Sequence, residues 1–159
     1  MRRSTAAEFE QMGTMKCLII AAGKGSRLRQ PGDSKLLILR FVGLPLIERV
    51  IRIAMEAGAD DFYVVTGYRE KIVRIFLAGL TRRLGCRITP VFNRDWKKEN
   101  GLSVLWARAY LQEPFFLLMA DHFFDTHTFF STSLPNTLFR HFRLLNSERD
   151  PIKFESHAL

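Results

Sequence analysis

Continuous apolar runs recur along the chain and predict the strands of a buried sheet. Residues 16–22 form the first run, which ends at a glycine, as expected of a strand covered on both faces. Three further runs, at 62–68, 86–92 and 115–120, predict a second, third and fourth strand. The links that join these runs to the segments between them are short, so we expect a compact alternating fold.

Helical spacing of apolar residues fills the stretches between the runs. The first stretch begins at Leu46 and stops at Gly58, the second covers 70–84 and closes at Gly85, and the third covers 102–111. The resulting order, β-α-β-α-β-α-β, predicts an α/β fold with a parallel sheet, helices on both faces and right-handed crossovers. Ligands of such sheets bind beyond the carboxyl ends of the strands.

Residues 126–159 do not continue this alternation. All ten glycines precede residue 102, and the tail shows only a weak helical stretch at 138–145. We therefore divide the chain into an N-terminal extension (1–14), a domain of alternating strands and helices (15–125) and a divergent tail (126–159).

The charge balance changes the picture, because it indicates an anionic partner. The chain carries 24 lysines and arginines against 16 acidic residues, a net charge of +8, and nearly all of the excess lies before residue 126. No run of five like charges occurs, so a ligand of nucleotide size fits better than a nucleic acid. The cysteines, Cys17 and Cys86, lie in apolar contexts without CxxC spacing and are expected to be buried reduced thiols.

No targeting or membrane segment is recognisable in the sequence. The longest apolar runs fall short of the roughly 20 residues that a membrane-spanning helix needs. Residues 1–14 lack the apolar core of a secretory signal. We therefore expect a cytoplasmic protein.

The loop AAGKGSRLRQPGDSK, at 21–35, combines backbone freedom with positive charge. Glycines bring backbone N–H groups close to a ligand, and arginine and lysine add charge that suits phosphate. The dinucleotide pattern GxGxxG fails at Leu28, and no window matches the Walker pattern. The loop therefore predicts a polyphosphate site of another kind.

Four segments carry a resemblance to a known family. Residues 18–35 resemble the AAGxGxR…K signature of the sugar- and alcohol-phosphate nucleotidyltransferases. VVTGY at 64–68, NRDWKKENGLSVLWAR at 93–108 and LMADHFFD at 118–125 resemble the CTP:inositol-1-phosphate cytidylyltransferases. The resemblance implies a Rossmann-like three-layer α/β/α fold with a mainly parallel sheet. Family members are usually longer, so it also implies that the C-terminal half is missing, as after a frameshift or premature stop.

The resemblance also implies a role for particular residues. The residues expected to bind the nucleotide are Ala22, Gly23, Gly25, Ser26, Gly67, Asn100 and Ser103, those expected to be catalytic are Arg27 and Lys35, and the one expected to hold Mg²⁺ is Asp121. The triphosphate would be cradled by Gly23, Gly25, Ser26 and Arg27, and Lys35 would neutralise the reacting phosphates. The last three of the binding set would face the cytosine or ribose. Mg²⁺ suits hard oxygen ligands such as a carboxylate.

Simpler interpretations of these residues stay open. Arg27 and Lys35 fit solvated surface charges, Asp121 fits a helix cap, and Asn100 with the following glycine fits a plain turn. Trp96 and Trp106 fit packing residues better than stacking platforms for a base.

The implied reaction is transfer of a cytidylyl group from CTP to inositol 1-phosphate, which yields CDP-inositol and pyrophosphate. Such transfer needs mainly positioning and charge neutralisation from the protein. Alternatives are a sugar-1-phosphate or phosphocholine nucleotidyltransferase, a non-catalytic nucleotide-binding module, and a basic nucleic-acid-binding protein supported by net charge alone. Without the acceptor half, activity itself is open. A sheet edge left exposed would favour self-association unless the tail covers it.

Overall fold

A computed structural model describes residues 15–24, 40–41, 43–98, 100–113, 115–120, 141–144 and 154–157. In chain order the elements are β1 (Met15–Ile20), β2 (Arg40–Phe41), β3 (Leu44–Pro45), α2 (Leu46–Glu56), β4 (Ala59–Thr66), α3 (Glu70–Leu84), β5 (Arg87–Phe92), α4 (Asn100–Ala107), η2 (Arg108–Tyr110), β6 (Phe115–Met119), β7 (His141–Leu144) and β8 (Phe154–His157). The four predicted strands and three predicted helices are therefore confirmed, with shifts at their ends.

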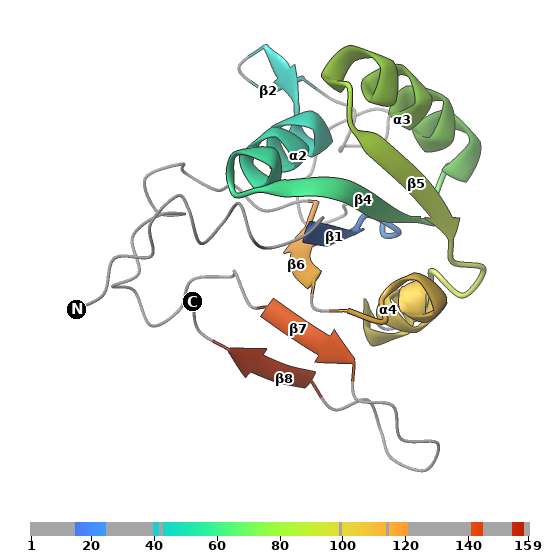
Figure 1. The fold of residues 1–159 in the computed structure, drawn as a ribbon. Helices are drawn as coiled ribbons and strands as arrows, with labels where there is room; N and C mark the ends of the chain where they lie inside the picture. The colour runs from blue at the N-terminus through green and yellow to red at the C-terminus, as the bar shows by residue number, and fades with distance from the viewer. Residues whose placement is uncertain are drawn as a thin grey trace.

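A single twisted sheet forms the centre of the molecule (Figure 1). Within the described residues it holds six strands in the order β5-β4-β1-β6-β7-β8, and β2 and β3 form a separate small hairpin. The first four strands of this order are mutually parallel, which confirms the predicted sheet. The mainly apolar strand β1 has a parallel neighbour on each side, as expected of a strand whose residues 17–20 are buried.

Successive residues of β1 point to opposite faces of the sheet and enter two separate cores. Cys17 and Ile19 belong to the core under α2 and α3, whereas Leu18 and Ile20 belong to the core under α4. Figure 1 shows α2 and α3 together on one face and α4 on the other. The fold is thus the three-layer, Rossmann-like α/β/α arrangement that the sequence predicts.

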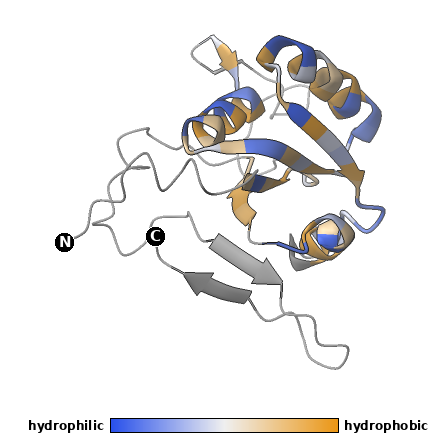
Figure 2. Cartoon of the chain, viewed as in Figure 1, coloured by the Kyte–Doolittle hydropathy of each residue, from blue (hydrophilic) through white to orange (hydrophobic). Residues whose placement is uncertain are grey.

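Glycines end two of the helices where the sequence predicts. Gly58, which follows α2, has a φ of 93°, and Gly85, which follows α3, has a φ of 66°. Both helices pack apolar residues against the sheet, among them Ile47 and Ile51 of α2 and Leu77 of α3. Figure 2 shows hydrophobic and hydrophilic segments alternating along both helices. Helix α4 departs from its prediction: it begins earlier, at Asn100, and continues after Ala107 as the 3₁₀ turn η2.

The tail contains strands rather than the weak helix predicted for 138–145. Residues 141–144 form β7, which pairs antiparallel with β6, and β8 pairs antiparallel with β7. Without β7, the edge of β6 would present backbone N–H and C=O groups with no hydrogen-bond partner. Pairing these groups outweighs the weak helical periodicity of the segment. The helical prediction is therefore wrong here, whereas the possibility that the tail covers the sheet edge is confirmed for these strands.

Two smaller expectations concern thiols and membranes. Cys17 and Cys86 are both free and buried, as predicted, and burial raises the pKa of each thiol. Among the helices that the structure describes, none combines the length and the apolar character needed to cross a bilayer.

Candidate functional site

The carboxyl end of β1 lies at the point where the strand order of the sheet reverses. The chain leaves β1 towards β4 on one side, and β6 later returns to pair with the other side. In open α/β sheets such a switch point creates a crevice for ligands. The turn that starts there is anchored on both flanks: the Ala21 N–H donates to the Val65 carbonyl at 2.9 Å, and the Ala120 N–H donates to the Ile20 carbonyl at 3.1 Å.

Gly67 brings the turn after β4 against the turn after β1. The Tyr68 N–H donates to the carbonyl of Ala22 at 2.9 Å, so the two turns are directly joined. A Cβ on Gly67 would overlap the Cβ of Trp96 and would lie 2.8 Å from the Ala22 carbonyl oxygen. Only glycine leaves room for this approach, which accounts for the residue by packing.

Gly23 differs from Gly67, because a Cβ there would meet nothing within 4 Å. It is exposed, directly beyond the buried Ala22, and it begins the exposed end of the turn. Its backbone is therefore in the position from which a glycine-rich loop can present N–H groups to an anion.

Asn93 ties the loop after β5 to helix α4. Its N–H donates to the Thr66 carbonyl at 2.8 Å, and its Oδ1 accepts from the Asp95 N–H at 2.8 Å. Its Nδ2 donates to the Ser103 Oγ at 3.1 Å, and both side chains are buried. This network fixes the first turns of α4 relative to the end of β4, because every polar group of the Asn93 side chain has a partner.

A ring pair, formed by Tyr68 and Trp96, lies beside these turns. The ring centroids are 5.5 Å apart and the planes are tilted by 53°. The ammonium of Lys24 lies 5.5 Å from the Tyr68 centroid and 5.9 Å from the Trp96 centroid. Lys97 and Arg69 approach the rings to 5.7 Å, Lys97 at Trp96 and Arg69 at Tyr68. The carboxyl edge of the sheet therefore carries three cations on two aromatic rings.

The structure describes four of the ten predicted site residues in full. Ala22, Gly23 and Gly67 meet at the joined turns, and Ser103 lies in the Asn93 network, which connects it to the same edge. The backbone of Asn100 starts α4, so the alternative of a plain turn before the helix is wrong. Five residues lie outside the described part: Gly25, Ser26, Arg27, Lys35 and Asp121.

Sequence reasoning missed Lys24 and the ring pair. The contact between Trp96 and Gly67 spans two loops, and no spacing in the sequence indicates it. The available signal was a lysine between two glycines and an aromatic residue directly after Gly67. The prediction that Trp96 packs is confirmed, since it lies against the α4-side core. For Trp106, which is 38% exposed on α4, it stays a prediction.

The residues described by the structure offer no cluster of three or more His, Cys, Asp or Glu side chains suited to a metal ion. Asp121, the predicted Mg²⁺ ligand, is not among them. The pKa of Tyr63 is raised, mainly by burial and then by the hydrogen bond that its hydroxyl donates to Asp61 at 2.9 Å. Asp61 is near the start of β4, away from the turn at Gly67, so this pair does not belong to the candidate site.

Comparison with known proteins agrees with this geometry. The family described as MobA-like NTP transferase domain matches residues 17–139. A bifunctional IPC transferase and DIPP synthase of Rubrobacter xylanophilus is 39% identical over 105 residues, which cover 65% of this chain and 23% of that protein.

Two solved structures share the fold. The inositol-1-phosphate CTP transferase from T. maritima superposes with a TM-score of 0.64 at 25% identity, over 84% of this chain and 54% of the other. A UDP-glucose pyrophosphorylase complexed with UDP-glucose gives a TM-score of 0.56 at 28% identity, over 68% and 46%. The chain thus spans about a quarter of the Rubrobacter protein and about half of each structure.

Proposed function

Because the chain belongs to the family of MobA-like NTP transferase domains, we propose that it transfers a cytidylyl group from CTP to inositol 1-phosphate. An oxygen of the acceptor phosphate attacks the α-phosphorus of CTP, the bond to the β-phosphate breaks, and pyrophosphate leaves. The products are CDP-inositol and pyrophosphate. The observation that carries the proposal is the glycine turn at the switch point between β1 and β6, anchored on both flanks with Gly23 exposed.

The choice of CTP and inositol 1-phosphate is supported by two relatives. The Rubrobacter protein, at 39% identity, is a bifunctional IPC transferase and DIPP synthase, and the T. maritima structure is an inositol-1-phosphate CTP transferase. The segments 64–68, 93–108 and 118–125 support the same branch by their resemblance to it.

The proposed division of labour follows the signature. Backbone N–H groups of Gly23, Gly25 and Ser26 bind the triphosphate, and Arg27 and Lys35 neutralise charge on the reacting phosphates. Gly67, Asn100 and Ser103 belong to the side of the site that receives the cytosine and ribose. In this arrangement Ser103 acts through the position of α4, because its hydroxyl is buried against Asn93.

A divalent metal is expected with such chemistry, and Mg²⁺ bound by Asp121 would supply charge neutralisation at the phosphates. The described residues hold no cluster of three or more His, Cys, Asp or Glu side chains suited to the ion, and no step of the proposed mechanism is assigned to it.

Uridylyl transfer to a sugar 1-phosphate is the second candidate. It is favoured by the 28% identity to a UDP-glucose pyrophosphorylase, which aligns with 68% of this chain. The two candidates differ in base and acceptor, so a substrate panel separates them.

The test is a thermal-unfolding series with Mg²⁺ and CTP, UTP, GTP, ATP or dTTP in turn. Selective binding raises the midpoint, since a ligand at 100 times its Kd stabilises the native state by about 2.7 kcal/mol. A rise with CTP, followed by pyrophosphate release with inositol 1-phosphate, supports the proposal. A rise with UTP and turnover of glucose 1-phosphate supports the second candidate.

Two outcomes contradict an enzymatic function. CTP binding without pyrophosphate release for either acceptor indicates a non-catalytic nucleotide-binding module. No midpoint shift with any of the five nucleotides overturns the proposal altogether. Arg27→Gln is the matched variant, and we expect it to lower turnover at least tenfold while the midpoint without ligand stays unchanged.

A further inference from the structure

We propose that Lys24 is a phosphate-binding side chain, which rests on the ring pair of Tyr68 and Trp96 and turns to the phosphates of an arriving ligand. The inference rests on the proposed function in that it takes the turn after β1 as the phosphate-binding turn. It adds a residue outside the signature, because the signature leaves the position between its two glycines open.

The ammonium of Lys24 contacts two aromatic rings and no acidic side chain among the described residues. Its ammonium lies within 6 Å of both ring centroids, and no described carboxylate lies within ion-pair distance of it. Lys98, two residues beyond Trp96, shows the usual arrangement, with a 2.8 Å ion pair to Asp95. Among the described residues, no carboxylate therefore neutralises the charge of Lys24 near the turn.

Further positive charge gathers on the same rings. Lys97 lies 5.7 Å from the Trp96 centroid, likewise without an ion pair in the described residues, and Arg69 lies 5.7 Å from the Tyr68 centroid. Each of the three cations lies within 6 Å of a ring of this pair, so their positive potentials add beside the rings and attract an anion there. Phosphate, with several charged oxygens, suits such a surface.

The resting contact is weaker than the one that would replace it. A cation–π contact at an exposed site contributes less than a charge-assisted hydrogen bond from an ammonium to a phosphate oxygen. The backbone allows the change, because Lys24 is exposed and is flanked by Gly23, which has open space around it. Arrival of a phosphate group is thus expected to draw Lys24 off the rings.

Trp96 provides the readout, since its indole senses the ammonium at 5.9 Å. The chain has two tryptophans, so a Trp106→Phe background leaves Trp96 as the single indole. In this background the protein is titrated, with Mg²⁺, with CTP, CMP, inorganic pyrophosphate and inositol 1-phosphate. Fluorescence and calorimetry are recorded for the Trp106→Phe parent and, in the same background, for Lys24→Gln, Lys24→Arg and the control Lys98→Gln.

We expect Lys24→Gln to weaken binding of the responsive ligand about tenfold and to abolish most of the Trp96 fluorescence change. Lys24→Arg restores both, because it restores the charge, and Lys98→Gln stays within about twofold of the parent because Lys98 is already paired. The thermal midpoint without ligand stays the same in all variants. A structural role of Lys24 would move that midpoint and would not depend on charge.

The ligands distinguish the source of the phosphate. A response to CTP and pyrophosphate assigns Lys24 to the nucleotide's polyphosphate, and a response to inositol 1-phosphate alone assigns it to the acceptor. The inference is overturned if Lys24→Gln binds every ligand as the parent does, or if saturation leaves the Trp96 emission unchanged. Lys24-dependent pyrophosphate binding without nucleotide turnover separates failure of the proposed function from failure of this inference.

Discussion

Gly67 illustrates how one atom constrains the site. Gly67→Ala places a Cβ against the Cβ of Trp96 and the Ala22 carbonyl, so we expect a loss of about 1–3 kcal/mol in the free energy of unfolding. Gly79→Ala is the control, because a Cβ there meets nothing within 4 Å in the middle of α3. It should stabilise the protein by about 0.5–1 kcal/mol. Urea unfolding measures both, and equal midpoints for the two variants would contradict the packing argument.

Cys17 makes stability depend on pH in the alkaline range. Burial raises the pKa of its thiol, so above the ordinary value of about 8.5 the unfolded chain releases a proton that the folded chain keeps. The contribution of the protonated Cys17 thiol to the free energy of unfolding is therefore complete below that pH. Above it, this stabilisation is lost by about 1.4 kcal/mol per pH unit. Urea unfolding between pH 7 and 10.5 measures the slope.

Cys17→Ala is the control for that slope. It should be less stable at pH 7, because it leaves a small cavity, and its stability should fall less steeply with pH than that of the parent. Parallel curves for parent and variant would show that the thiol of Cys17 does not cause the alkaline loss.

At the scale of single residues, the sequence predicted which residues belong to this edge of the sheet better than it predicted their contacts. The resemblance of residues 64–68 to the cytidylyltransferases assigned Gly67 to the nucleotide, whereas its packing against Trp96 depends on a loop that follows a different strand. Ser103 was predicted on the same grounds, and its hydroxyl is buried against Asn93. Contacts between loops depend on the three-dimensional arrangement, which local patterns do not contain.

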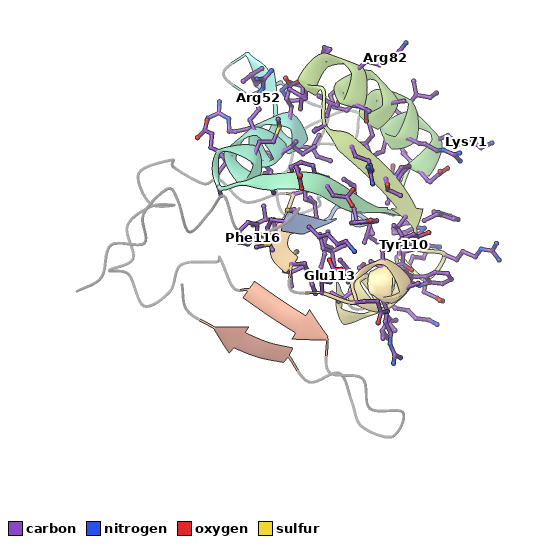
Figure 3. All side chains as sticks on the ribbon, viewed as in Figure 1. Arg52, Lys71, Arg82, Tyr110, Glu113 and Phe116 are labelled. Carbon is purple, nitrogen blue, oxygen red and sulfur yellow. The ribbon has the colours of Figure 1, made fainter. Side chains whose placement is uncertain are left out.

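At the scale of elements, Glu48 joins helices α2 and α3. The buried carboxylate accepts hydrogen bonds from Arg52 of its own helix at 2.8 Å and from Arg83 of α3 at 2.7 Å. Figure 3 shows Arg52 on α2, and Arg82, the neighbour of Arg83, on α3. Glu48 thus fixes the relative position of the two helices that cover one face of the sheet.

Glu48→Gln should lower the free energy of unfolding by about 1–2 kcal/mol. The charge is lost, and the single amide oxygen can accept from only one of the two arginines, which bond different carboxylate oxygens. The value is below that of a fully buried pair, since the arginine side chains are about half exposed. Glu70→Gln is the matched control, with a partner, Arg74, at 3.8 Å on the surface of α3. A change of less than about 0.5 kcal/mol is expected there, and similar losses in both variants would contradict the bridging role.

Element ends were predictable where the chemistry is local. Gly58 and Gly85 end α2 and α3 in the sequence and in the structure, because their positive φ values favour glycine. The start of α4 was placed too late, since the Asn93–Ser103 hydrogen bond supports its first turn from outside the helix. The spacing of apolar residues along the sequence does not reveal a hydrogen bond from another segment.

The whole sheet depends on what lies beside β6. Strand β7 pairs with Phe115 and Phe116 of β6, and β8 continues the sheet. A chain that stops before His141 leaves this edge open, so we expect self-association that increases with protein concentration. Size-exclusion chromatography with light scattering measures it, with the full chain as the control. A shortened chain that stays monomeric would show that these strands do not protect the edge.

The parallel sheet was predictable because four apolar runs alternate with helical stretches, and right-handed crossovers leave few arrangements. The two added strands were not, because their pairing with β6 is remote in sequence and their side-chain pattern is weak. Global topology thus followed from local periods as far as β6 and no further.

The central position of β1 sets an order of events during synthesis on the ribosome. Ile20 pairs with Val65 on one side and with Met119 on the other, so the first partner emerges long before the second. Strands β1, β4 and β5 can pack with α2 and α3 while one flank of β1 still waits for β6. The turn that begins at Ala21 therefore gains its second flanking strand, β6, late in synthesis. Ligand recognition should be among the last properties that the nascent chain acquires.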